Sequence, residues 1–258
     1  MPHHEPVGDG RDRKATTPVA EDETSHARGR PTVSAIYARH KQGGGLWSAH
    51  VSNRLAACIV VMANRQGWTP NALSLANLAI GTGSGIFVIA LHHDRGLCAI
   101  VAFIGWQVAY ALDCADGQLA RHLEAGSSAG ALVDVLCDYL VQSVLTAAVF
   151  VVIAPHFAAS TIALAGPLVA TGLLLALFDT TVAVQVARIR PSGGRSTALT
   201  IIKRTVRDYG LTVAVIPLLI WLSPEGLLAF TAAEATLNAL AVTKRIADAV
   251  RTPPAATT

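Results

Sequence analysis

Four aspartates embedded in two long apolar runs are the feature that most constrains how this chain can fold. The first run, residues 97–112, leads directly into the sequence Asp113-Cys114-Ala115-Asp116-Gly117-Gln118-Leu119-Ala120-Arg121. The second run, residues 129–154, contains Gly130, Asp134 and Asp138. On a helix, residues three, four, seven and eight positions apart share a face. That spacing places Asp113, Asp116, Gly117, Ala120 and Arg121 on one helix face, and Gly130, Asp134 and Asp138 on one face of the next helix.

The short link at residues 122–126 predicts that the two helices are antiparallel neighbours. At a rise of about 1.5 Å per residue, Asp113 lies about 12 Å from Arg121 along the first helix. By the same measure Asp134 and Asp138 lie about 12 and 18 Å beyond Gly126. The two acidic faces can therefore meet at one depth.

Carboxylates that meet in this way repel one another, and each costs about 2.5–3.5 kcal/mol at the centre of a bilayer. Divalent metal ions are the simplest way to hold them together, and an all-carboxylate ligand set suits hard ions such as Mg²⁺, Ca²⁺ or Mn²⁺. Two alternatives use the same residues: a buried polar network that joins helices, and a proton relay in a metal- or proton-coupled membrane transporter.

The full spacing resembles the signature of the CDP-alcohol phosphatidyltransferase family, D-x2-D-G-x2-A-R-x8-G-x3-D-x3-D. Every defined position of that signature is filled, and the resemblance covers residues 69–245. It implies an enzyme of phospholipid biosynthesis that moves a phosphatidyl group from a CDP-linked lipid, usually CDP-diacylglycerol. The acceptor is the hydroxyl of a small alcohol, which attacks the β-phosphate, and CMP is released.

The resemblance also implies roles for individual residues. Two divalent ions, Mg or Mn, would be held by Asp113, Asp116, Asp134 and Asp138. Asp138 would also be the general base that takes the acceptor's hydroxyl proton. The cytidine diphosphate part of the donor would contact Asp116, Gly117, Ala120, Arg121 and Gly130. By the same analogy the protein would be a homodimer.

Composition places the rest of the chain in a membrane. Of its 258 residues 52% are hydrophobic and only 14% are charged, and a net charge of +3 is too small to indicate a nucleic-acid partner. We therefore expect an all-α polytopic membrane protein with six transmembrane helices. The expected spans are residues 72–91, 97–120, 127–154, 159–187, 205–222 and 225–243, and the fifth has the shortest apolar run and contains Pro217.

The segments outside this membrane domain are polar or amphipathic. Residues 1–44 are expected to form a mostly disordered cytosolic tail, and residues 246–258 a second one. Residues 45–67 predict an amphipathic interfacial helix that ends at Gly67, with an apolar face formed by Trp47, Val51, Leu55, Ile59 and Met62. A helix that docks onto a protein partner is the alternative. Thr69 and Pro70 then predict the start of the first membrane helix.

The distribution of basic residues predicts the topology. Of the 20 Lys and Arg residues, only Arg95 falls on the side opposite to the termini when the six spans are drawn. The positive-inside rule therefore places both termini and the acidic motif in the cytosol of a multi-pass cell-membrane protein.

A basic cluster that follows the fourth span leads to a hypothesis about the acceptor. Topology and attraction to anionic lipid explain such a cluster on their own. However, family members that use inositol phosphate place basic residues near the ends of their last three helices. The comparable residues here are Arg188, Arg190, Arg204 and Arg245, which favours inositol phosphate or glycerol phosphate as the acceptor.

Overall fold

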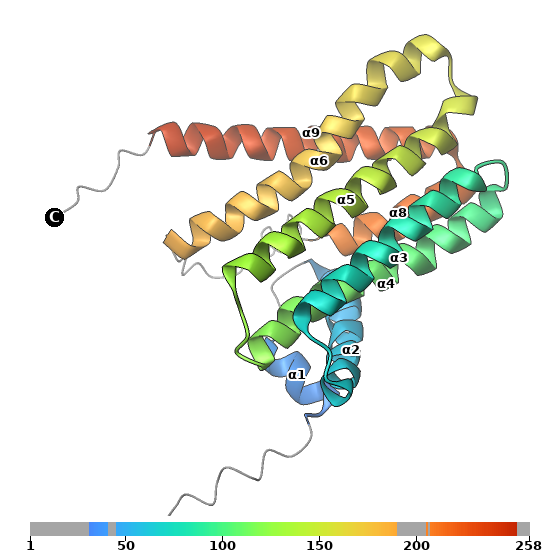
Figure 1. The fold of residues 1–258 in the computed structure, drawn as a ribbon. Coiled ribbons are helices and arrows are strands. Elements are labelled where there is room, and N and C mark those ends of the chain that lie inside the picture. The colour runs from blue at the N-terminus through green and yellow to red at the C-terminus, as the bar shows by residue number, and fades with distance from the viewer. Residues whose placement is uncertain (1–30, 41–44, 190–204, 206, 252–258) are drawn as a thin grey trace, which may run out of the picture. The chain divides into compact units, whose positions relative to one another are not determined.

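The computed structural model describes residues 31–40, 45–189, 205 and 207–251, without the side chains of residues 179–189 and 249–251. Within these residues the chain is helical, and no β-strand occurs in them. The α-helices are α1 Val33–His40, α2 Asn53–Gln66, α3 Pro70–Ala90, α4 Arg95–His122, α5 Ser128–Ile153, α6 Ala159–Ile189, α8 Tyr209–Leu222 and α9 Pro224–Arg251 (Figure 1). A π-helical turn, Ser48–Ser52, precedes α2 directly. The all-α prediction is confirmed for the described residues.

Five segments of the described chain are long and apolar enough to cross a membrane. They are Pro70–Ala90, Arg95–His122, Ser128–His156, Ala159–Phe178 and Pro224–Asp248. These correspond to the expected first, second, third, fourth and sixth spans, with boundaries that differ by at most five residues, except that the fourth segment ends nine residues before the expected end. The membrane character of the chain thus follows from both its sequence and its helices.

Helix α8, at the place of the expected fifth span, is too short to meet the same criterion. It has 14 residues and begins at Tyr209, because the Asp208 side chain caps it by accepting a hydrogen bond from the Gly210 N–H (3.1 Å). Such a helix is about 21 Å long, whereas the hydrocarbon core is about 30 Å thick. The expected count of six spanning helices is therefore not confirmed.

Arg95, the basic residue expected on the side opposite to the termini, contacts the C-terminal end of α8. Its guanidinium donates to the carbonyls of Ile220 and Trp221, both at 2.8 Å. The last carbonyls of a helix have no partner within the helix, and a cation near them is favourable. Arg95 at the start of α4 therefore caps the short helix.

Capping residues set the other boundaries that enclose the acidic motif. The side chains of Thr69, Asp94 and Ser127 each accept a backbone N–H in the first turn of α3, α4 and α5, respectively. Gly67 ends α2 with φ +71°, a conformation that glycine adopts without steric strain. The predicted helix start at Thr69 and helix end at Gly67 are both confirmed.

Glycines bring α3 very close to its two neighbours, α4 and α5. A Cβ atom added to Gly81 would lie 2.7 Å from a methyl group of Val141, and one added to Gly85 would lie 2.6 Å from Val144, both on α5. On the other side, a Cβ at Gly105 of α4 would overlap the Ser84 hydroxyl of α3. Small residues allow this approach, as in other membrane helix pairs. The three helices that surround the acidic motif are therefore tightly packed (Figure 1).

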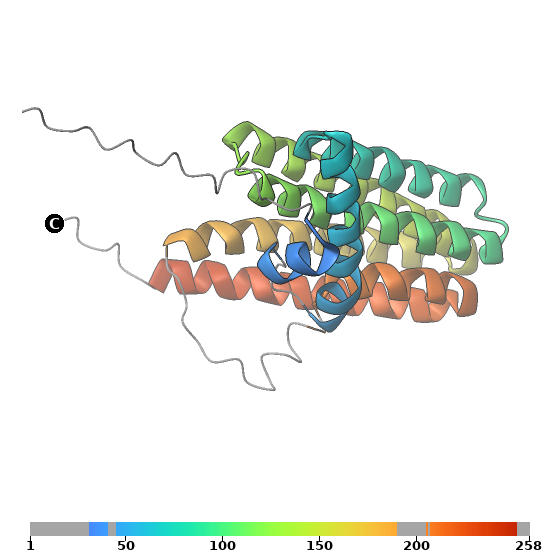
Figure 2. The ribbon, with the colours of Figure 1, turned by 90° about the horizontal axis from the view of Figure 1, so that it is seen from below.

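The pair α1 and α2 packs on the C-terminal half of α4, with α2 lying across the direction of α4 (Figure 2). Ala56, Ala57 and Val60 of α2 are fully buried against residues of α4 that include Leu112, Ala115 and Leu119. Leu55 and Met62 on the opposite face remain 46% and 59% exposed. Helix α1 lies within residues 1–44, which were expected to be mostly disordered. Its short length and mixed composition gave no clear periodic signal.

The close approach of α3 to α5 can be tested with two glycines of α3. Gly85→Val should lower the free energy of unfolding by about 1–3 kcal/mol, because the added methyls overpack the contact with Val144. Gly83→Val is the matched control, since a Cβ at Gly83 meets no atom within 4 Å. Thermal unfolding of both variants in the same detergent checks this. Equal destabilisation by the two substitutions would contradict the packing described here.

Candidate active site

Three of the four motif aspartates converge between α4 and α5. Carboxylate oxygens of Asp113, Asp116 and Asp134 lie within 4.8 Å of one another. Asp138, one turn after Asp134, lies outside this group but within hydrogen-bonding reach of Asp113. The prediction that the two acidic faces meet at one depth thus agrees with the structure.

Helix α3 supplies two polar side chains that hold these acids and that sequence reasoning missed. The Ser74 hydroxyl donates to Asp116 Oδ2 at 2.5 Å, and the Asn77 amide donates to Asp138 Oδ1 at 3.3 Å. Asn71 lies one turn before Ser74, and its Oδ1 would be 3.2 Å from a Cβ at Gly130. A signal for them was present, because Asn71, Ser74 and Asn77 recur every three residues among apolar residues in the first half of this helix.

The burial of the acids is consistent with a metal centre. Asp116 is only 5% exposed, and the other three aspartates are half-buried. Among the described residues, Asp134 Oδ1 is buried without a hydrogen-bond partner. Buried carboxylate oxygens normally have a partner, and an all-oxygen donor set is the one that Mg²⁺ and Mn²⁺ prefer. The residues present therefore fit a divalent cation.

Two tyrosine side chains pack together near the aspartates. The rings of Tyr110 and Tyr209 pack edge to face with centroids 5.1 Å apart, and both lie within electrostatic reach of Asp113. The Tyr209 hydroxyl donates to Gln142 Oε1 at 2.9 Å, one turn beyond Asp138 on α5. This bond fixes the start of α8 against α5 next to the acids.

Tyr110 is hydrogen-bonded to the π-helical turn that precedes α2. Its hydroxyl is hydrogen-bonded to the Ser48 hydroxyl at 2.8 Å. Ser48 in turn donates both its backbone N–H (2.8 Å) and its hydroxyl to the buried carboxylate of Asp208. Asp208 thus joins the π-helical turn, α4 and α8. Sequence reasoning missed it, because a single acid in a link between helices carries no periodic signal.

The positions predicted to contact the nucleotide line the same end of the helix pair. Gly117, Ala120 and Gly130 are half-buried. A Cβ atom added to Gly130 would lie 3.1 Å from the Ser127 hydroxyl oxygen. Arg121, at the end of α4, is exposed and lies within electrostatic reach of Asp116. Its guanidinium donates to the backbone carbonyl of His40 at 3.0 Å. Arg121 thus lies on the helix that carries Asp113 and Asp116 and contacts α1 there.

The predicted acceptor-binding residues lie largely outside the described residues. Arg190 and Arg204 are not described, and only the helical backbone of Arg188 is. Arg245 lies half-buried on α9. Their assignment to the acceptor stays a prediction.

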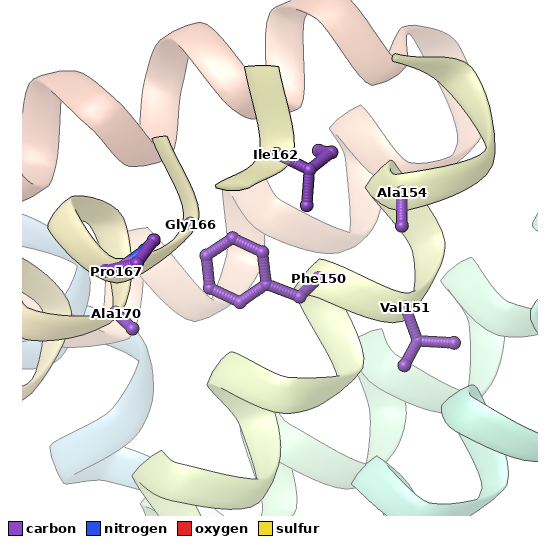
Figure 3. A pocket seen from close by; sticks show the side chains of 7 residues that line it. All are labelled: Phe150, Val151, Ala154, Ile162, Gly166, Pro167 and Ala170. Carbon is purple, nitrogen blue, oxygen red and sulfur yellow. The ribbon is translucent and has the colours of Figure 1, made fainter. Parts of the chain in front are cut away.

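One pocket lies far from this chemistry, between the distal ends of α5 and α6. It has a volume of about 380 Å³ and is formed by Phe150, Val151, Ala154, Ile162, Gly166, Pro167 and Ala170 (Figure 3). Every lining residue is apolar, so the pocket offers no group for acid–base catalysis or metal binding. This apolar pocket is therefore not the candidate active site, whereas the acidic cluster has the groups that such a site requires.

Comparison with known proteins agrees with this assignment. The family model described as CDP-alcohol phosphatidyltransferase matches residues 67–243, which include α3, α4, α5 and all four aspartates. No curated protein sequence matches the chain.

Loss of one ligand should show whether the acidic cluster binds metal. Asp134→Asn should weaken Mn²⁺ binding by at least about tenfold, because it removes a charged oxygen ligand from the group. Without metal the variant should be no less stable than the parent protein, since one repelling charge is gone. Electron paramagnetic resonance titration of Mn²⁺ measures the affinity, and thermal unfolding in EDTA measures the stability.

Glu225→Gln is the matched control, because Glu225 lies in the first turn of α9 and bonds to Ser223 there. Unchanged Mn²⁺ affinity in Asp134→Asn, or an equal loss in the control, would contradict a metal centre at the acidic cluster.

Proposed function

Because the chain belongs to the CDP-alcohol phosphatidyltransferase family, we propose that it transfers a phosphatidyl group from CDP-diacylglycerol to the hydroxyl of a small alcohol. The acceptor oxygen forms a bond to the β-phosphorus of the donor, the bond from that phosphorus to the CMP leaving group breaks, and the hydroxyl proton goes to a base. The observation that carries the proposal is the convergence of the motif aspartates within a membrane helix bundle. Nothing in the family match supports the transporter alternative.

Asp138 is the proposed general base. It is the motif carboxylate that lies outside the tightest acidic group, which suits a side chain that must exchange a proton with the substrate. The hydrogen bond from Asn77 to Oδ1 orients its carboxylate. The Tyr209–Gln142 pair restricts the position of α5 beside it. A base held in this way can take the proton as the acceptor oxygen attacks.

Asp113, Asp116 and Asp134, joined by Asp138, would hold two divalent ions, Mg or Mn. Bound there, such ions neutralise charge on the diphosphate and on the leaving phosphate. Ser74 orients one of these carboxylates through its hydrogen bond to Asp116. The protein's own contribution is thus a preorganised, mostly buried set of oxygen atoms.

The donor's cytidine diphosphate is proposed to lie along Gly117, Ala120 and Gly130, where small side chains allow a nucleotide to approach the helix backbones. Arg121 supplies the positive charge for the diphosphate, since a guanidinium can bind two phosphate oxygens at once. Its position within electrostatic reach of Asp116 supports this assignment, because donor and metal ligands must be neighbours.

We further propose that α2 lies in the cytosolic membrane interface, with both termini and the active site on the cytosolic side. Leu55, Cys58 and Met62 share its outward, exposed face, as expected for a helix that contacts lipid there. Between Glu23 and Asp94 the chain has no acidic residue, which favours the anionic inner leaflet. A homodimer completes the proposed assembly, by analogy with the family.

The reaction and its base are tested together by release of labelled CMP from CDP-diacylglycerol, with purified protein and a panel of alcohols. The parent protein should release CMP only in the presence of an acceptor alcohol and a divalent ion. Asp138→Asn should lower kcat by about a hundredfold or more, yet still bind the donor. Donor binding is measured in parallel by isothermal titration calorimetry. Full activity in EDTA, or in Asp138→Asn, would contradict the mechanism.

The acceptor is proposed to be a phosphorylated polyol, with inositol phosphate ahead of glycerol phosphate. Its dianionic phosphate would require several cations, and Arg188, Arg190, Arg204 and Arg245 are the candidates. Arg188→Gln and Arg204→Gln should therefore raise the acceptor KM by about tenfold and the donor KM much less. Arg65→Gln, at the end of α2, is the control for general loss of basic charge. Equal small effects on both KM values, or rapid turnover with serine, would contradict this acceptor.

A further inference from the structure

The last backbone carbonyl of α1 is hydrogen-bonded to Arg121, the arginine of the aspartate motif. His40 is the last residue of α1, and its carbonyl oxygen accepts a hydrogen bond from Arg121 Nη2 at 3.0 Å. The final carbonyls of a helix lack partners within the helix and carry partial negative charge, so a guanidinium is favoured there. Residues 33–40 lie ahead of residues 67–243, which match the family. The contact therefore comes from a part of the chain that the family match does not cover.

Several side chains fix α1 in this position. Ile36 is only 2% exposed and packs in the hydrophobic cluster formed by α2 and α4. The Tyr37 hydroxyl donates to the Ala49 carbonyl at 2.9 Å, and the Arg54 guanidinium lies 5.6 Å from the centre of the Tyr37 ring. These contacts join α1 to the π-helical turn and to α2. The position of the His40 carbonyl is thus determined by tertiary packing as well as by the short helix itself.

The ring of His40 packs against His122, the residue that follows Arg121. It is 8% exposed and meets the His122 ring edge to face, with centroids 5.6 Å apart. Burial, followed by the nearby His122, Arg39 and Arg121, lowers the pKa of His40. The lowered pKa favours the neutral ring, which packs there without adding a positive charge next to Arg121.

A long arginine side chain at a helix end has many conformations, and a fixed acceptor reduces them before a ligand arrives. The guanidinium has five N–H donors in one plane, so it can bond to a carbonyl and to a phosphate at the same time. We infer that α1 is a positioning element of the active site, which holds Arg121 through the His40 carbonyl for the diphosphate of the CDP-linked donor. This inference relies on the proposed function only for the identity of that ligand.

The inference is tested by releasing α1 without changing Arg121. Ile36→Asp removes the buried anchor, and Ile36→Ala is a milder version in case Ile36→Asp does not give folded protein. Val33→Asp is the matched control, because Val33 lies on the same helix and is exposed. In the Ile36 variant the donor KM should rise by about tenfold with kcat little changed, as expected for loss of a bond to a charged group. The control should match the parent protein.

Modification of Arg121 by phenylglyoxal, followed by mass spectrometry of the resting protein, gives a readout that needs no turnover. The rate should increase severalfold in the Ile36 variant and stay unchanged in Val33→Asp. Failure of the transfer reaction would therefore not prevent this test. Unchanged Arg121 modification in a folded Ile36 variant would overturn the inference.

A double-mutant cycle separates positioning from general loss of structure. If α1 acts through Arg121, Ile36→Asp should add little to the donor KM of Arg121→Lys, because coupled residues have non-additive effects. Additive effects in the cycle would show that α1 stabilises the protein independently of Arg121, and would also overturn the inference.

Discussion

Repulsion between buried carboxylates is the constraint on which the rest of the structure depends. Asp113, Asp116 and Asp134 approach within 4.8 Å in a bundle of apolar helices, where water screens their charges poorly. Such a cluster persists only if packing holds the helices together. Helix α3 approaches α5 closely at Gly81 and Gly85, and it approaches α4 closely where Ser84 faces Gly105. The same approach brings Ser74 and Asn77 to the acids, so stability and preorganisation of the site share one origin.

Arg121 and several hydrogen-bonded polar side chains lie at the same end of the bundle as this acidic centre. Asp208 binds Ser48 and caps α8, so the π-helical turn and the short apolar helix α8 are fixed by one side chain. On the neighbouring face α1 and α2 pack on α4, and the carbonyl of His40 at the end of α1 accepts a hydrogen bond from Arg121. Helices α1 and α2 and the π-helical turn between them, which precede the family-matched residues, therefore pack against the helix that carries Arg121. Their role differs from that of a simple polar tail.

The motif was predictable because its residues are periodic and local. Spacings of three and four placed the aspartates on facing helices, and Thr69 and Gly67 have capping chemistry that sequence alone reveals. Asp208 and Tyr209 were not predictable, since their partners Ser48 and Gln142 are distant in sequence. The length of α8 was overestimated, because hydropathy does not show where a capping aspartate starts a helix. The role of α1 depends on a main-chain carbonyl, which has no sequence signal.

Anomalous X-ray diffraction from crystals grown with Mn²⁺ and CDP would locate the metal relative to the acidic cluster. Manganese peaks are expected at coordination distance from carboxylate oxygens of Asp113, Asp116 and Asp134, with the diphosphate between the metal and Arg121. Manganese bound elsewhere, with these carboxylates paired only to protein groups while CDP is bound, would contradict a metal-assisted transfer at the acidic cluster.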